Sequence, residues 1–148
     1  MTESSRIRYY TLVGFFVIGG VTVLLGQVLP ILSHRLNLND AQAGTFFLAQ
    51  YCGSITGTLI STRIARSYGF VITTLAGLLM MIVGLPGLNF HEFVLCWISI
   101  LVYGIGLGLT IPGINLLTIE ATPPERQSSA VNLVNFSWGI GAISSQPF

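Results

Sequence analysis

The chain contains 148 residues, of which 52% are hydrophobic and only 7% are charged, and its formal net charge is +1. Soluble domains are about a quarter charged because their surfaces face water, so this composition excludes an ordinary soluble protein. It is typical of a protein whose solvent is lipid.

The few charged residues stand at intervals and separate five uncharged runs, each of 22 residues or more. A helix needs about 20 residues to cross roughly 30 Å of hydrocarbon. The sequence therefore predicts an all-α membrane protein with five transmembrane helices in a single domain, 1–148. We expect these helices at residues 9–32, 41–62, 70–89, 93–119 and 128–148.

The first run, residues 9–32, follows Arg6 and Arg8 as the apolar part of a signal peptide follows its charged start. The run is too long for that role, lacks a small-residue cleavage site and is followed by four similar runs. None of the runs alternates polar and apolar residues as the strands of a membrane barrel do. We therefore expect this helix to stay in the protein and every span to be helical.

The stretch GSITGTLISTRIARSYG, residues 53–69, carries Arg63 and Arg66 between two apolar segments. All six basic residues are arginines, and a cytoplasmic N-terminus would place only Arg35 on the outer side. Cytoplasmic loops carry the excess of positive charge, so this bias predicts that orientation in the cell inner membrane. Residues 53–69 then form the cytoplasmic end of the second helix and its turn into the third. The arginines serve as topology anchors, alone or together with a functional role.

Glycines at helical spacing mark two of the predicted helices. Gly53 and Gly57 stand four apart in the second helix, and Gly104 and Gly108 stand four apart in the fourth. Lipid gives helices little hydrophobic reason to associate, so small residues that let backbones approach do much of the packing. We expect Gly53, Gly104 and Gly108 at helix contacts.

Polar side chains within the apolar runs are candidates for a solute pathway, because such groups are costly in lipid. Asn132 and Asn135 share one face of the fifth predicted helix, Asn115 follows Pro112 in the fourth, and Gln27 precedes Pro30 in the first. We expect a polar cavity between helices 1, 4 and 5, and the alternative is hydrogen bonding between helices. The candidate substrate-binding residues are Gln27, Asn115, Asn132, Asn135 and Trp138, and helix packing is the alternative role for Trp138.

No motif for catalysis or for a bound cofactor is evident. Cys52 and Cys96 lie in different predicted helices at different depths, which favours packing over a disulfide or a metal site. The glycines of YGIGLGLTIPG lack the preceding strand and the following acidic residue of a dinucleotide-binding loop. We therefore expect no enzyme activity, no cofactor, no metal and no nucleic-acid partner.

Several features occur in an order that resembles a known family. A glycine-bearing helix leads into a basic turn, GIGLG in the fourth helix precedes PGIN, and the fifth helix reads NLVNFSWGIGA. Together with the short loops, these features resemble the N-terminal portion of a major facilitator superfamily transporter, of the fucose permease-like sugar branch. The resemblance covers essentially the whole chain. It implies an incomplete N-terminal half of a twelve-helix bundle, whose partners would be the missing C-terminal helices.

The family's motif in the loop between helices 2 and 3 is present only in part. Gly57, Arg63, Arg66 and Gly69 match its glycine and basic positions, whereas Ser61 stands where the family has an aspartate. Proton-coupled members also carry a carboxylate or an arginine in helix 1 or 4 that this sequence lacks. Symport would therefore need a coupling site elsewhere in the protein.

The resemblance implies secondary active transport of a small polar solute, a sugar in particular, by alternating access across the cytoplasmic membrane. Five helices alone are not expected to do this, so the chain is interpreted as a fragment of a transporter. One alternative is a scaffold or assembly subunit that transports nothing and needs only packing faces. The other is a small multidrug exporter, which the strong arginine bias and the missing membrane glutamate disfavour.

Overall fold

The computed structural model describes residues 3–146, and these residues form helices without any strand. Three stretches are long and apolar enough to cross a membrane: Arg6–Leu36, Asp40–Asn89 and Phe93–Glu120. The all-α prediction is confirmed, while five separate spans stay a prediction. The elements in chain order are α1 (Glu3–Thr22), α2 (Leu24–Leu36), α3 (Asp40–Gly84), the 3-10 helix η1 (Leu85–Asn89), α4 (Phe93–Glu120), the 3-10 helix η2 (Pro124–Arg126) and α5 (Gln127–Ser144).

The chain divides into two compact units. The terminal unit consists of Met1–Leu24 and Gly113–Phe148, and it contains α1, the last part of α4 and α5. The central unit consists of Leu25–Pro112, and it contains α2, α3, η1 and the first part of α4. The chain therefore passes between the units beside the break between α1 and α2, and again at the proline within α4.

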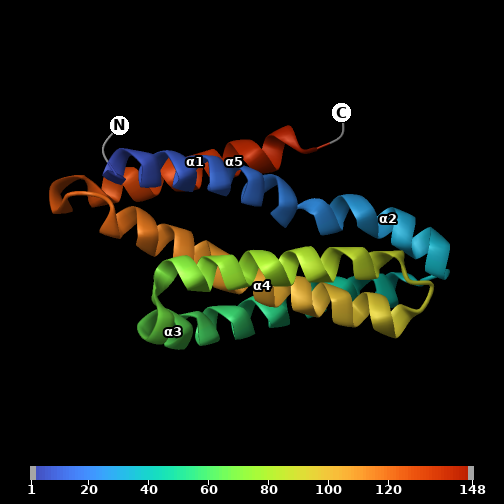
Figure 1. The fold of residues 1–148 in the computed structure, drawn as a ribbon. Coiled ribbons are helices and arrows are strands. Elements are labelled where there is room, and N and C mark those ends of the chain that lie inside the picture. The colour runs from blue at the N-terminus through green and yellow to red at the C-terminus, as the bar shows by residue number, and fades with distance from the viewer. Residues whose placement is uncertain (1–2, 147–148) are drawn as a thin grey trace. The chain divides into compact units, whose positions relative to one another are not determined.

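In the terminal unit, α1 and α5 run side by side along most of their length (Figure 1). Their backbones are close because glycines face the partner helix: a methyl group at Gly19 would collide with the carbonyl of Trp138, and one at Gly141 with the carbonyl of Phe16. Ser137 adds a hydrogen bond by donating its hydroxyl to the Leu12 carbonyl at 2.9 Å. Small residues thus hold this helix pair together, as expected for helices in lipid.

In the central unit, α3 is two antiparallel helical limbs joined at Gly69 (Figure 1). Gly69 has φ 85° and ψ 167°, a conformation that only glycine adopts without strain. The expected turn at residues 63–69 is therefore much tighter than the sequence suggests, and the first limb stays helical through Arg63 and Arg66. The stretch between Gly57 and Gly69 contains no glycine or proline, so nothing in it ends the helix earlier.

The first limb of α3 packs closely against α4. A methyl group at Gly53 would collide with the Leu101 carbonyl, and one at Gly108 with the Ser54 carbonyl. Gly104 is equally close to the backbone at Gln50. Since backbone cannot move aside as a flexible side chain can, these positions accept no larger residue without separating the helices.

The core of the central unit lies at the end of the unit where α2, η1 and the start of α4 meet. Phe46 and Phe93 contact each other edge to face, with ring centroids 5.4 Å apart. The fully or nearly fully buried members of this core are Leu25, Leu32, Phe46, Ala49, Leu88, Cys96 and Ile100. Cys96 is thus a packing residue, and both it and the exposed Cys52 are free thiols.

Arg35, which the sequence places in the loop after the first span, holds the end of this core together. Its guanidinium donates hydrogen bonds to the carbonyls of Leu88 and Phe90, the second at 3.0 Å. Both carbonyls lie where η1 ends and have no helical partner in the next turn, so a cation there is favourable. Arg35 therefore acts as a structural clamp between the end of α2 and the α3–α4 connection.

The observed helix ends refine the expected ones. The first helix was expected at residues 9–32, but α1 starts at Glu3, α2 ends at Leu36 and a break falls at Val23. The β-branched run Val21 to Val23 disfavours helix, and the Thr22 hydroxyl bonds back to the Ile18 carbonyl at 2.7 Å, a contact that often bends helices. The fifth helix ends at Ser144 rather than 148, and residues 147–148 lie outside the described residues.

Candidate functional site

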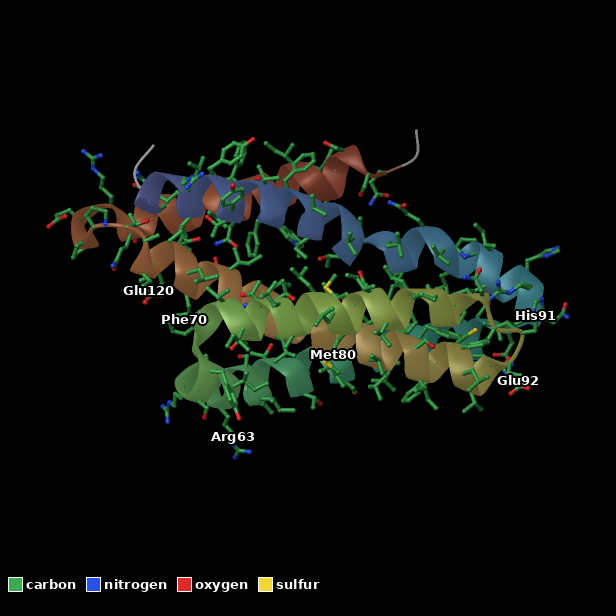
Figure 2. The ribbon with its side chains drawn as sticks, viewed as in Figure 1. Arg63, Phe70, Met80, His91, Glu92 and Glu120 are labelled. Carbon is green, nitrogen blue, oxygen red and sulfur yellow. The ribbon has the colours of Figure 1, made fainter. Side chains whose placement is uncertain are left out.

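Charged residues of the central unit lie at its two ends. Figure 2 shows Arg63 beside the turn between the limbs of α3 and His91 with Glu92 at the opposite end. Arg63 and Arg66 are exposed, as are His91 and Glu92. This distribution is what a bilayer imposes, because charges are excluded from its hydrocarbon and sort to the two water boundaries.

The motif residues at the α3 turn differ in role. Gly57 lies against α4, where a methyl group would collide with the Ile105 carbonyl, and Gly69 forms the turn itself. Ser61, at the family's aspartate position, is buried and donates its hydroxyl to the Thr58 carbonyl of its own helix at 2.6 Å. The hydroxyl is therefore satisfied locally.

Helix α5 presents three different faces. The face toward α1 contains the buried residues Val134 and Gly141. A second face is exposed and apolar, and it carries Leu133, Phe136, Ile140 and Ile143. The third face is exposed and polar, and its members follow one another at steps of three or four: Ser128, Asn132, Asn135 and Gln146.

The two asparagines of the polar face are the strongest candidates for contact with a solute. Asn132 and Asn135 are both exposed, and Gly139 beside them has no neighbour within 4 Å of an added Cβ. Asn135 donates from Nδ2 to the Val131 carbonyl at 2.9 Å, one turn earlier on the same helix. Its carbonyl oxygen points out from a helix whose adjoining face is apolar, so the polar face needs water or protein against it in a membrane.

The remaining candidates occupy less open positions. Asn115 is half-buried in α4, and its Oδ1 atom is buried without a hydrogen-bond partner among the described residues. Trp138 donates its indole N–H to the Thr22 hydroxyl at 3.4 Å, which favours helix packing as its role. Gln27 is half-buried on α2, takes part in an interaction there and belongs to the central unit, whereas the other four belong to the terminal unit.

A cavity of about 530 Å³ lies in the terminal unit. None of the five predicted substrate residues lines it, so sequence reasoning missed it. Its two charged members, Arg8 and Arg126, were expected only to fix topology, and their common side of the membrane was the one signal that could have joined them. The lining residues are Arg8, Thr11, Leu12, Thr118, Thr122, Arg126, Ser129, Ala130, Leu133 and Val134.

Among the described residues, no group of three or more His, Cys, Asp or Glu side chains is placed to hold a metal ion. What the geometry offers is amides, hydroxyls and guanidinium groups on apolar helices, which bind solutes reversibly by hydrogen bonds and charge.

These features define a multi-pass α-helical membrane protein with polar surfaces set within its apolar helices. The chain matches the family model for the Major Facilitator Superfamily over residues 3–146, and it belongs to that family. It is 28% identical over 140 residues to a candidate metabolite transport protein of Haemophilus influenzae strain Rd. That alignment covers 90% of this chain and 33% of the relative, so the chain spans about a third of the relative's length. No solved structure gives a significant match.

Proposed function

We propose that this chain is the N-terminal portion of a secondary transporter that moves a small polar solute, a sugar in particular, by alternating access. The family assignment supports a transporter rather than an enzyme, and the relative's name supports metabolite transport. Members of this superfamily are built from two halves that rock about a site near the middle of the membrane. The C-terminal helices would then be the partners that complete this site.

The observation that carries the proposal is the exposed polar face of α5. Asn132 and Asn135 lie one turn apart on a helix whose other faces pack on α1 or are apolar. Lipid offers such amides no hydrogen bonds, so the face belongs against a water-filled cavity or another protein segment. An amide both donates and accepts, which suits the hydroxyl groups of a sugar and agrees with the fucose permease-like resemblance.

Asn115 is a second contributor in the same unit. Its buried Oδ1 atom lacks a hydrogen-bond donor, and leaving a buried acceptor unpaired costs about 1 to 3 kcal/mol. A solute hydroxyl or a water molecule would satisfy it. Gln27 and Trp138 stay in the proposed solute set, with Trp138 acting through its ring face, because its indole N–H is used by Thr22.

In this proposal the N-terminus is cytoplasmic and the protein lies in the cell inner membrane. Arg63 and Arg66 then face the cytoplasm, and Arg35 faces the outside. If transport is symport, the coupling group lies outside these helices, because no acidic residue occurs within the apolar runs.

A scaffold or assembly subunit is the second candidate function. It is favoured by Trp138 and Asn135, whose amide or indole hydrogens are used within the helix pair. In that case the polar face of α5 packs on a neighbouring protein and stays dry.

Solute uptake by the complete gene product separates the two candidates. Asn132→Ala and Asn135→Ala should each lower uptake efficiency at least about tenfold, since each removes a hydrogen bond from a buried solute. Ile140→Ala is the matched control, because Ile140 is on the exposed apolar face of the same helix and should leave uptake near the parent level. Equal uptake by all variants at equal expression would favour the scaffold.

A further inference from the structure

The cavity of the terminal unit is cationic, and solute transport does not account for it. Arg8 reaches it from α1 and Arg126 from η2, at the connection between α4 and α5. Arg8 is half-buried and Arg126 is exposed. The described residues that line the cavity include no Asp or Glu, and the exposed Glu120 and Glu125 lie outside the lining. Two guanidinium groups in one cavity favour an anionic ligand, because guanidinium matches the geometry of phosphate and carboxylate oxygens.

The backbone of α5 adds to this positive potential. Ser129 and Ala130 lie in the first turn of α5 and line the cavity, and no side chain caps the N-terminus of this helix. Uncapped N–H groups in a first turn carry partial positive charge and bind anions. The helix terminus reinforces the two arginines, which alone already define the sign of the site.

The hydroxyl groups of the cavity do not compete for the arginines as charged groups would. Thr11, Thr118 and Thr122 donate their hydrogens to the carbonyls of Arg8, Ile114 and Thr118, at 2.9, 2.9 and 2.6 Å. All three side chains are nearly fully buried. The arginines and the first turn of α5 are therefore the anion donors, and the threonines form the neutral floor.

The other wall of the cavity is apolar, which selects among anions. Leu12, Leu133 and Val134 lie in the same lining as the arginines. A volume of about 530 Å³ accommodates a ligand of drug size rather than an ion alone. A ligand that carries a phosphate and a hydrocarbon part satisfies both walls.

Aromatic residues place this cavity at the membrane surface. Tyr9 and Tyr10 follow Arg8 directly, are more than half exposed and contact each other edge to face with centroids 6.0 Å apart. Exposed tyrosines on a membrane helix are typical of the headgroup level, where one side is apolar and the other is wet. The cavity therefore lies where a lipid phosphate would be.

We propose that this cavity binds the headgroup phosphate of an anionic phospholipid between Arg8 and Arg126, with the first acyl carbons against Leu12 and Leu133. Basic pockets between membrane helices are a general means of binding such lipids. The site would tie the connection between α4 and α5 to α1 and would be occupied independently of any transported solute.

The test uses the protein in nanodiscs of phosphatidylcholine with a minor share of phosphatidylglycerol, and counts the phosphatidylglycerol that stays bound after extraction into detergent. Each arginine near the surface strengthens binding by about fivefold, so Arg8→Gln and Arg126→Gln should each weaken retention about fivefold, and the double variant about 25-fold. The matched control is the double variant Arg63→Gln with Arg66→Gln, which removes the same charge from exposed residues outside the lining. It should retain phosphatidylglycerol at the parent level.

Two results would overturn the proposal. Equal loss in both double variants would show general attraction to charge, and equal retention in both would show that the cavity takes no anionic lipid. A double variant of Arg8→Lys with Arg126→Lys guards against misfolding, because it keeps the charges and should retain most of the lipid. In a parallel titration with inorganic phosphate in detergent, binding that needs Arg8 and Arg126 without retention of phosphatidylglycerol would assign the site to a soluble phosphate and contradict the lipid assignment.

Discussion

The central and terminal units bury their helices in different ways. The central unit has a continuous apolar core and close backbone contacts along two helix pairs, since both Gly53 on the first limb of α3 and Gly77 on the second lie against α4. The terminal unit has one close helix pair, a cationic cavity and an exposed face of amides. In a single solvent such as lipid, the sealed unit suits a support, and the unit with polar surfaces suits contact with solutes or headgroups.

The largest expected difference between the units concerns glycine. Gly108→Val should destabilise the protein by about 3 kcal/mol or more, because the new side chain meets the backbone of Ser54 and forces α3 and α4 apart. Gly139→Ala in the terminal unit has open space, and it should be neutral or stabilising by up to about 1 kcal/mol, since alanine is the better helix former. Unfolding in detergent measures both, and similar losses would contradict the distinction.

A smaller effect is expected for the arginine clamp of the central unit. Arg35→Gln should cost about 1.5 to 3 kcal/mol, because it removes charged hydrogen bonds to the carbonyls of Leu88 and Phe90. The control Arg63→Gln changes an exposed arginine and should stay within about 0.5 kcal/mol. Loss of stability in the control alone would show that the α3 turn, rather than the α2 end, depends on its cation.

The sequence predicted the central unit better than the terminal one. The charges that end each apolar run located α4 within one residue, and glycines four apart pointed to the α3–α4 contact. These signals are local: they depend on composition over one helix. The single glycine with positive φ, Gly69, ended the limb where the sequence alone suggested a longer turn.

The terminal unit depends on residues far apart in the chain, which no local pattern connects. Arg8 and Arg126 share a cavity, and Gly19 lies against the backbone at Trp138. The periodicity of Asn132 and Asn135 gave the correct common face of α5, but it could not tell which face packs on α1. The clamp formed by Arg35 was missed for the same reason, because its partners are more than 50 residues away.

The smallest expected effect concerns stability at the polar face. Asn132→Ala should change the free energy of unfolding by no more than about 0.5 kcal/mol, because this side chain is exposed. Trp138→Phe, at the contact with α1, should cost about 1 kcal/mol through loss of the hydrogen bond to Thr22. A larger loss for Asn132→Ala than for Trp138→Phe would mean that the polar face is a packing surface.

Accessibility of two cysteine variants tests the central claim, that lipid is the solvent of these helices and sorts their charges to opposite water boundaries. His91→Cys and Ser67→Cys lie near opposite ends of the central unit and are made in a background with Cys52→Ser, since Cys96 is buried. With a membrane-impermeant maleimide, the account predicts labelling of His91→Cys in right-side-out spheroplasts and of Ser67→Cys only in inside-out vesicles. Labelling of both variants from the same side would contradict it.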